Sequence, residues 1–247
     1  MDDNGWDASA GAWIADMGEY GADFSRRYVL DAPMLARVAL LPPGRALDVG
    51  CGEGRFCRTL RALGWEVVGL DPTVALLDEA RRRDPGGAYA KGVAEALPFP
   101  DGAFALVVSY LSLIDIPDMR VGIREMARVL GPEGRLLVAN MNSFATAGDG
   151  LAVAGDALGW RTDAAGRRRF FAMDRYLEER VSWLEWRGIR IQNHHRPLSA
   201  YLQAFLAQGL LLTHFDEPSP APDAPPGRAA SYRRAPWHCV MEWRKGA

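Results

Sequence analysis

One glycine-rich segment limits the folds open to this chain more than any other feature. Ala46-Leu47-Asp48-Val49-Gly50 is a short apolar run that ends in glycine, and glycines recur at positions 52 and 54. The run predicts a buried strand, and glycines at this spacing let the backbone turn tightly and approach a ligand closely. A helix predicted over residues 54–63 begins there, and its free N–H groups favour a carboxylate or a phosphate. The segment therefore predicts a strand, a ligand-binding loop and a helix.

The same alternation of strands and helices continues along the chain. Further strands are expected at residues 66–70, 88–91, 104–109 and 135–139, with helices at 74–83 and 118–130. Such alternation implies a parallel sheet that helices cover on both faces. Ligands of these sheets bind beyond the carboxyl ends of the strands, near the switch in strand order. One rim should therefore carry residues 50–54, 71–73, 92–95, 109–115 and 140–146.

The flanking parts of the chain have weaker patterns. Residues 8–40 read as two helices broken near Gly18–Gly21, and residues 141–180 as irregular to helical. Farther on, the pattern predicts strands at 181–186 and 189–193, a helix at 198–208 and extended segments at 210–215 and 237–243. Residues 217–228, rich in proline and alanine, predict an exposed loop.

Composition narrows the class of protein. A chain of 247 residues with a net charge of −2 fits one α/β domain with additions and does not suggest a nucleic-acid partner. No run of about 18 apolar residues predicts a membrane span, and the N-terminus lacks the pattern of a signal peptide. Three cysteines without a CxxC pair indicate reduced thiols and a cytoplasmic protein, and no cluster has metal-ligand spacing.

Two observations bear on the ligand. The dinucleotide fingerprint GxGxxG fails in both registers, because Arg55 or Cys57 stands where a glycine or alanine is needed, which disfavours NAD. Asp71 ends the second predicted strand, where a carboxylate can accept both ribose hydroxyls of a nucleoside. Asp71 could instead cap the helix that follows Pro72, but its position after the glycine loop favours ribose binding.

Four segments together resemble the class I S-adenosylmethionine (SAM)-dependent methyltransferases. Leu47–Phe56 is similar to motif I of that family, and Val68–Asp71 to its acidic loop. Residues 92–101 resemble the adenine-side loop, and residues 124–137 the following helix and fifth strand. The resemblance implies an α/β fold, with a doubly wound, Rossmann-like, mostly parallel seven-stranded sheet. It also implies a helical cap or lid at 1–43 and a SAM-binding domain at 44–247, with 141–200 as a substrate-side insertion.

The resemblance also implies roles for individual residues. The glycine loop would hold the methionine part of SAM, Asp48 would support that loop or reach the amino group, and Ser109 would line the methionine end. Val93 stands where the family often has the aspartate that binds adenine, so adenine recognition would rest on backbone groups or Glu95. The predicted cofactor contacts are Asp48, Gly50, Cys51, Gly52, Asp71, Pro72, Val93, Ala94, Glu95 and Ser109.

The acceptor side is less well defined by the sequence. Methyl transfer from a sulfonium requires alignment and exclusion of water, and a base only for some acceptors. His195 is the candidate base, although it could instead pack against the helix that begins near Pro197. The aromatic residues of the N-terminal segment could cover the acceptor or simply pack a helix. Candidate acceptor contacts are Tyr20, Tyr28, Tyr110, Asn140, Asn142 and His194.

The sequence thus predicts a methyltransferase that uses SAM, releases S-adenosylhomocysteine (SAH) and methylates a small molecule as a monomer or homodimer. Three alternatives stay open: a non-catalytic SAM-binding protein, an NAD(P)-dependent oxidoreductase on a similar fold, and an enzyme that methylates proteins. The C-terminal strands could extend the sheet, as in the resembled family, or contribute to a dimer.

Overall fold

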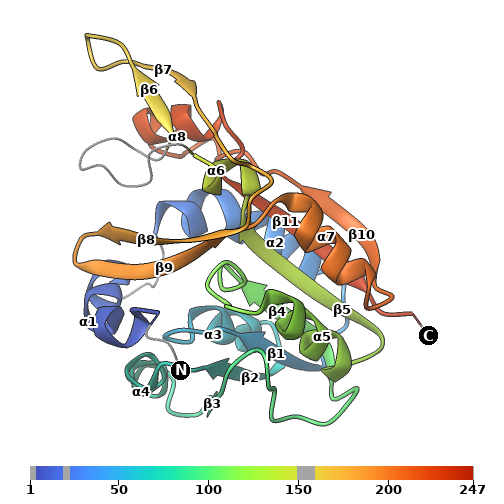
Figure 1. Ribbon diagram of the computed structural model, residues 1–247. Helices are drawn as coiled ribbons and strands as arrows, with labels where there is room; N and C mark the ends of the chain where they lie inside the picture. Colours follow the sequence, from blue (N-terminus) through green and yellow to red (C-terminus); the bar gives the residue numbers. More distant parts are fainter. Residues whose placement is uncertain (1–3, 19–22, 149–158, 247) are drawn as a thin grey trace.

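A seven-stranded sheet forms the centre of the computed structural model, which describes residues 4–18, 23–148 and 159–246 (Figure 1). Its strands are β1 (Arg45–Val49), β2 (Glu66–Asp71), β3 (Ala88–Lys91), β4 (Phe104–Tyr110), β5 (Leu130–Met141), β10 (Leu211–Asp216) and β11 (His238–Arg244). Their order is β10-β11-β5-β4-β1-β2-β3, and only β11 runs antiparallel to its neighbours. The predicted fold class is confirmed, and the two C-terminal strands extend the sheet.

Helices cover both faces of this sheet, because its strands carry apolar side chains on both sides. In β4, Val107 packs on one face, and Leu106 and Val108 on the other. The first face is covered by α5 (Met119–Val129) and α7 (Leu198–Leu206). The second is covered by the π-helix η1 (Arg26–Leu30), α2 (Asp31–Val38), α3 (Arg55–Ala62) and α4 (Val74–Arg83). Since α2 contacts β5 and β11, part of the N-terminal segment belongs to the layers of the sheet.

Strand β5 begins five residues earlier than the sequence pattern predicts. Residues 131–134 lie between the predicted helix at 118–130 and the predicted strand at 135–139, and their glycines and proline resemble a turn, yet Leu130 already pairs with Phe104. A register shift follows, after which Leu106 pairs with Arg135. The glycines and proline of this segment therefore form an irregularity within the strand and not a separate turn.

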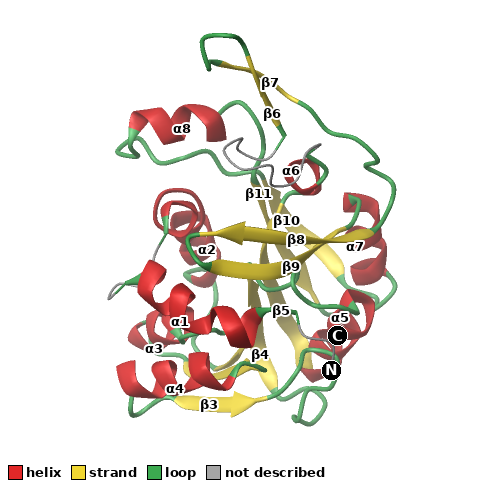
Figure 2. Cartoon of the chain, turned by 60° about the vertical axis from the view of Figure 1, so that its left-hand side comes forward, coloured by secondary structure: helices red, strands yellow, loops and turns green. Residues whose placement is uncertain are grey.

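Two elements outside the sheet lie together over its carboxyl ends. Strands β8 (Arg180–Trp186) and β9 (Ile189–His195) form a separate antiparallel hairpin around Gly188, whose φ of 79° suits the turn. Helix α1 (Trp6–Met17) contacts both β9 and α4. Figure 2 shows α1 between α4 and the hairpin, so this helix connects the sheet domain to the hairpin.

The remaining described segments differ from expectation. Residues 141–180 contain α6 (Ser143–Thr146) and a hairpin of β6 (Trp160–Thr162) and β7 (Arg168–Phe171), which the sequence did not predict. The proline-rich segment is partly packed rather than exposed: Ala224 is buried, and the Ala221 N–H donates to the Tyr28 carbonyl over 2.7 Å. Helix α8 (Pro226–Tyr232) begins within it.

Among the described residues, no helix is both long and apolar enough to cross a membrane. Within the same ranges, no group of three or more His, Cys, Asp and Glu side chains is arranged to hold a metal ion.

Candidate functional site

The glycine loop after β1 has a backbone that only glycine adopts easily. Gly50, Gly52 and Gly54 have φ angles of 75°, 54° and 77°, in the left-handed region that side chains disfavour. A Cβ atom on Gly50 would lie 2.3 Å from the Cβ of Ser112, whereas one on Gly52 would meet open space. Gly50 therefore permits close packing against the loop after β4, and Gly52 faces the cavity described below.

Asp48 lies directly beneath this loop and has an unsatisfied oxygen. It is 2% exposed, and its Oδ2 accepts a hydrogen bond from the Cys57 thiol over 3.4 Å. Its Oδ1 is buried and has no partner among the described residues. Burial raises the pKa of Asp48 to about 7. A buried carboxylate oxygen without a donor is costly, and a cationic amino group in the cavity would satisfy it.

Asp71 joins the glycine loop to the start of α4. Its Oδ2 accepts the Gly52 N–H and its Oδ1 accepts the Thr73 N–H, each over 2.9 Å. These bonds fix the plane of the carboxylate and leave each oxygen able to accept a second donor, such as a ribose hydroxyl. Burial is the main influence on the pKa of Asp71 and raises it. Asp71 therefore supports the turn before α4, whose N-cap residue is Thr73, and it also faces the cavity, where the ribose interpretation expects it.

These residues open onto a cavity of about 1410 Å³ at the carboxyl ends of β1, β2 and β4. It is large enough for a nucleoside cofactor and a second small molecule, given that ligand pockets span roughly 300–1,000 Å³. Nine of the ten predicted cofactor contacts line it: Asp48, Gly50, Cys51, Gly52, Asp71, Pro72, Val93, Ala94 and Glu95.

Ser109 is the exception and needs correction. It is fully buried in β4 and does not line the cavity. Its Oγ lies 2.8 Å from the Oγ of Ser112, which donates to the Val49 carbonyl over 2.6 Å. Ser112, which the sequence analysis missed, lines the cavity in its place. Ser109 therefore supports the wall from behind, because its hydroxyl is bonded to that of Ser112.

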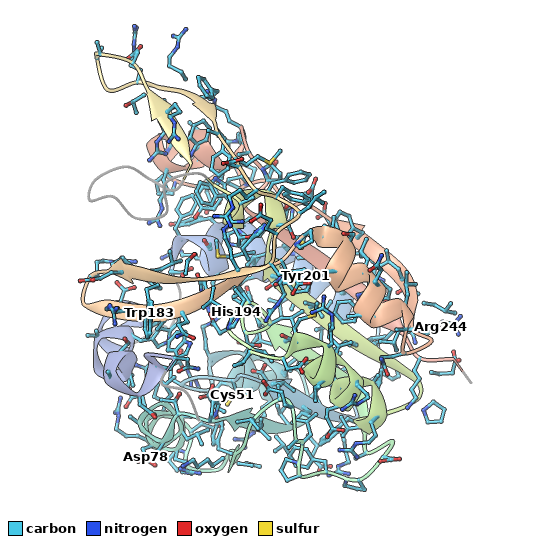
Figure 3. The ribbon with its side chains drawn as sticks, viewed as in Figure 1. Cys51, Asp78, Trp183, His194, Tyr201 and Arg244 are labelled. Atoms are coloured by element: carbon cyan, nitrogen blue, oxygen red, sulfur yellow. The ribbon has the colours of Figure 1, made fainter. Side chains whose placement is uncertain are left out.

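The far wall of the cavity comes from α1 and the β8–β9 hairpin. The Gln192 N–H donates to the Asn4 carbonyl over 2.9 Å, and the Ser9 hydroxyl donates to the Arg190 carbonyl over 3.0 Å. Trp6, Trp13, Met17, Val181, Gln192 and His194 contribute to this wall. In Figure 3, His194 lies on the hairpin and Cys51 on the opposing glycine loop. The cavity is thus enclosed between segments distant in sequence.

Two ionisable residues belong to this wall: His194, a predicted acceptor contact, and Asp115, which the sequence analysis did not single out. Asp115, in the loop after β4, accepts a hydrogen bond from Asn193 Nδ2 over 2.7 Å, and burial raises its pKa to about 8. His194 is 8% exposed, and its Nε2 has no partner among the described residues. Burial, with the nearby Arg196 charge, lowers the pKa of His194 to about 4. One feature of the sequence could have identified Asp115: it is an acidic residue on the rim where a ligand is predicted to bind.

His195, the predicted base, lies outside this cavity. Its Nδ1 is 2.7 Å from Thr146 Oγ1, and its Nε2 is 2.9 Å from the Tyr176 carbonyl. Both ring nitrogens are therefore engaged, and the imidazole borders a separate small void beside Met141. Because side chains alternate along β9, His194 takes the side that faces the cavity. The structure gives His195 a packing role, although its contacts are with Thr146 and Tyr176 rather than with the helix that follows Pro197.

Of the other predicted acceptor contacts, Tyr110 lines the cavity, and its hydroxyl donates to Asp31 Oδ1 over 2.7 Å. Tyr28, Asn140 and Asn142 do not line it. Asn142 caps α6 and donates to Glu217, while Asn140 is buried in β5. Their positions at a strand end suggested exposure at the rim, but β11 pairs with Asn140, and Trp237 and Glu217, which precede β11, bond to Asn142. Tyr20 lies outside the described residues.

The described residues fit SAM better than a dinucleotide. The unsatisfied Asp48 oxygen suits the amino group of SAM, Asp71 suits its ribose, and Val93 and Ala94 suit its adenine. The helix after the glycine loop begins at Arg55, whose guanidinium is already paired with Asp31 at 2.9 Å. A carboxylate below the loop is unsuited to a pyrophosphate, since like charges repel.

Comparisons with known proteins also indicate a SAM-dependent methyltransferase. A family model described as a methyltransferase domain matches residues 47–138. A solved SAM-dependent methyltransferase from Mesorhizobium loti is 30% identical, with a TM-score of 0.71 over 85% of this chain and 96% of that one. A Listeria monocytogenes structure described in the same terms is 25% identical, with a TM-score of 0.72 over 88% of this chain and 100% of that one.

A curated relative is the demethylmenaquinone methyltransferase of Renibacterium salmoninarum. It is 35% identical over 117 residues, which are 47% of either chain. The match thus spans about half the length of this relative.

Proposed function

This chain belongs to the SAM-dependent methyltransferases, and we propose that it transfers the methyl group of SAM to a small molecule held in its enclosed cavity. The supporting observation is that one cavity reaches from Asp48 and Asp71 to Asp115 and His194. Family membership removes the reason to consider a nicotinamide-dependent oxidoreductase.

The residues at the sheet end of the cavity would hold the cofactor, which supplies a methyl group activated by a sulfonium. Asp48 would bind the amino group, and Asp71 would accept hydrogen bonds from the ribose. Val93 and Ala94 would contact adenine, with Ile116 on the same cavity wall. Because these groups are fixed by the backbone, they would hold the methyl group in one position and lower the entropic part of the barrier.

The opposite wall would bind the acceptor and exclude water. Trp6 and Trp13 pack edge to face with ring centres 5.2 Å apart, and α1 is bonded to β9. A protein substrate would need an open rim to present a side chain, whereas α1 and the β8–β9 hairpin form one wall of this cavity. We further propose that α1 acts as the cap within residues 1–43, because η1 and α2 pack on the sheet, with 44–247 as the SAM-binding domain and 141–200 as its acceptor-side insertion.

Incubation with methyl-labelled SAM and a desalted cell extract, followed by ultrafiltration, tests the proposal. We expect label in the small-molecule fraction, and loss of that label with Asp71→Ala. Asp78→Ala is the matched control, because Asp78 is exposed on α4 and pairs only with Arg81 among the described residues. Label in the protein fraction would refute the small-molecule acceptor, and SAM binding without turnover would support the non-catalytic alternative.

A further inference from the structure

The acceptor end of the cavity has a polar centre built from three elements. Asp115 of the loop after β4 is held by Asn193 of β9 and by a hydrogen bond from the side chain of Trp6 in α1. The loop itself is fixed by Arg196, whose guanidinium donates to the carbonyls of Ile116 and Pro117 over 2.7 Å. Asp115 is therefore a preorganised carboxylate at the junction of loop, hairpin and cap.

An unsatisfied nitrogen lies on the same wall. The backbone N–H of His194 donates to the carbonyl of Ile114 over 3.0 Å. Because Ile114 directly precedes Asp115, this bond places His194 close to Asp115. The ring is more than nine-tenths buried and lines the cavity, yet Nε2 has no partner among the described residues. Its imidazole is neutral at physiological pH, because burial and Arg196 oppose its protonation. A bound group with an N–H or O–H would satisfy this nitrogen.

The charge of the wall favours a cation. Six carboxylates line the cavity: Asp7, Asp48, Glu53, Asp71, Glu95 and Asp115. Its three cationic side chains are Arg26, Arg55 and Lys91. Two of these are already neutralised from outside the cavity wall, Arg26 by Asp23 and Arg55 by Asp31, each at 2.9 Å, and Glu53 is likewise paired with Arg58 at 2.8 Å. Asp48 and Asp71 are assigned to the cofactor, which leaves Asp115 for the acceptor. An ammonium group beside Asp115 would lower its raised pKa and favour the ionised carboxylate.

Aromatic rings complete the surroundings of Asp115. Trp6 contacts it directly, and Trp13 and Tyr110 line the same cavity. The electron-rich faces of such rings attract ammonium groups. The Arg26 guanidinium already lies over Trp13 and Tyr110, 5.1 and 5.7 Å from the ring centres. The site thus combines a carboxylate, an unsatisfied nitrogen and aromatic surface.

We infer that the acceptor is an amine that is positively charged in solution, and that its nitrogen binds between Asp115 and His194, with Asp115 taking the proton that this nitrogen must lose. The inference rests on the proposed methyl transfer. The proton passes from the ammonium nitrogen to the carboxylate, which frees the nitrogen lone pair. That lone pair forms the bond to the methyl carbon as the bond from this carbon to sulfur breaks, and the electron pair of the broken bond stays on sulfur.

Calorimetric titration of the SAH-bound protein with three matched probes tests this inference: 2-phenylethylamine, 2-phenylethanol and 3-phenylpropionate. We expect the amine to bind at least about tenfold more tightly than the other two, because a charge-assisted bond to a buried carboxylate is strong. Asp115→Asn should abolish the preference, and His194→Gln should reduce it. Asp7→Asn, which removes the same charge elsewhere in the cavity wall, should retain it.

The SAH titrations distinguish a failure of the proposed function from a failure of the amine inference. Unchanged SAH affinity in every variant shows that each is folded, and failure of SAH to bind the native protein would refute the proposed function itself. If SAH binds, equal binding of amine and alcohol, or no amine binding, would overturn the amine inference alone. A preference for the amine that persists in Asp115→Asn would also overturn the amine inference alone.

Discussion

The two walls of the cavity are built in different ways. The cofactor wall comes from one continuous stretch, residues 48–96, in which each strand end supplies a loop to the same rim. The acceptor wall combines α1, the loop after β4 and the β8–β9 hairpin, which are far apart in sequence. The first wall depends on backbone conformation and the second on tertiary contacts. Mutations in the two walls should therefore separate cofactor binding from acceptor binding.

Gly50→Ala should have the largest effect. The added Cβ would lie 2.3 Å from Ser112 at a φ of 75°, which combines overpacking with backbone strain and should lower the free energy of unfolding by about 2–4 kcal/mol. SAH binding should be lost. Urea unfolding and SAH titration measure both effects. Gly52→Ala is the control, since its Cβ meets open space; it should destabilise less and still weaken SAH binding.

Gly5→Ala makes the equivalent change in the acceptor wall. Its Cβ would lie 2.1 Å from the Arg190 carbonyl oxygen at a φ of 87°. The contact between the start of α1 and β9 should open, at a cost of about 1–3 kcal/mol. Binding of the amine probe should fall while SAH affinity changes little. Equal loss of both ligands would show that the walls are not independent.

Asp115→Asn should change the pH dependence of stability. Burial raises the pKa of Asp115 from 3.8 to about 8, so the folded state binds more protons than the unfolded state between these values. Stability therefore falls as pH rises through this window. The variant should gain on the order of 1–3 kcal/mol relative to the native protein between pH 4 and pH 8.5.

Chemical denaturation at a series of pH values measures this difference. The charged and titratable groups that act on Asp115 are Arg26 and Asp71, with His194 on the adjacent wall; Trp6 and Asn193 donate to it. His194 stays neutral above its pKa of about 4. A difference that is constant with pH would mean that Asp115 is ionised throughout and is not buried in the way the structure shows.

His195→Gln should have the smallest effect. It breaks the contacts with Thr146 and Tyr176, which are worth about 0.5–1.5 kcal/mol each. Thermal unfolding should detect the loss, whereas amine binding and its pH dependence should match those of the native protein. A shifted pH profile of methyl transfer would restore His195 as a candidate base.

The difference between the two walls also explains what the sequence could predict. The glycine loop and Asp71 were identifiable because local rules apply to them: apolar runs, glycine spacing and an acidic residue at a strand end. Most elements between residues 45 and 139 were predicted for the same reason. The start of β5 was missed because pairing with β4 carries the strand through a segment that locally resembles a turn.

The acceptor wall depends on strand register and tertiary contacts, which local sequence patterns do not specify. In the hairpin, a shift of one residue decides whether His194 or His195 faces the cavity. The sequence named His194 as an acceptor contact but placed the base at His195, which faces away from the cavity. Asp115 belongs to no motif, and only its contact with Asn193 reveals its setting. Ser109 and Ser112 are three residues apart, so their exchange of roles depends on where β4 ends.

Calorimetric titration of SAH into the native protein, Asp71→Ala and the control Asp78→Ala tests the central claim most directly. The account predicts micromolar binding to the native protein and the control, and weakening of about 10- to 100-fold in Asp71→Ala, the value of one or two hydrogen bonds to a charged group. No binding to the native protein, or equal affinity in Asp71→Ala, would contradict the assignment of this cavity to the cofactor.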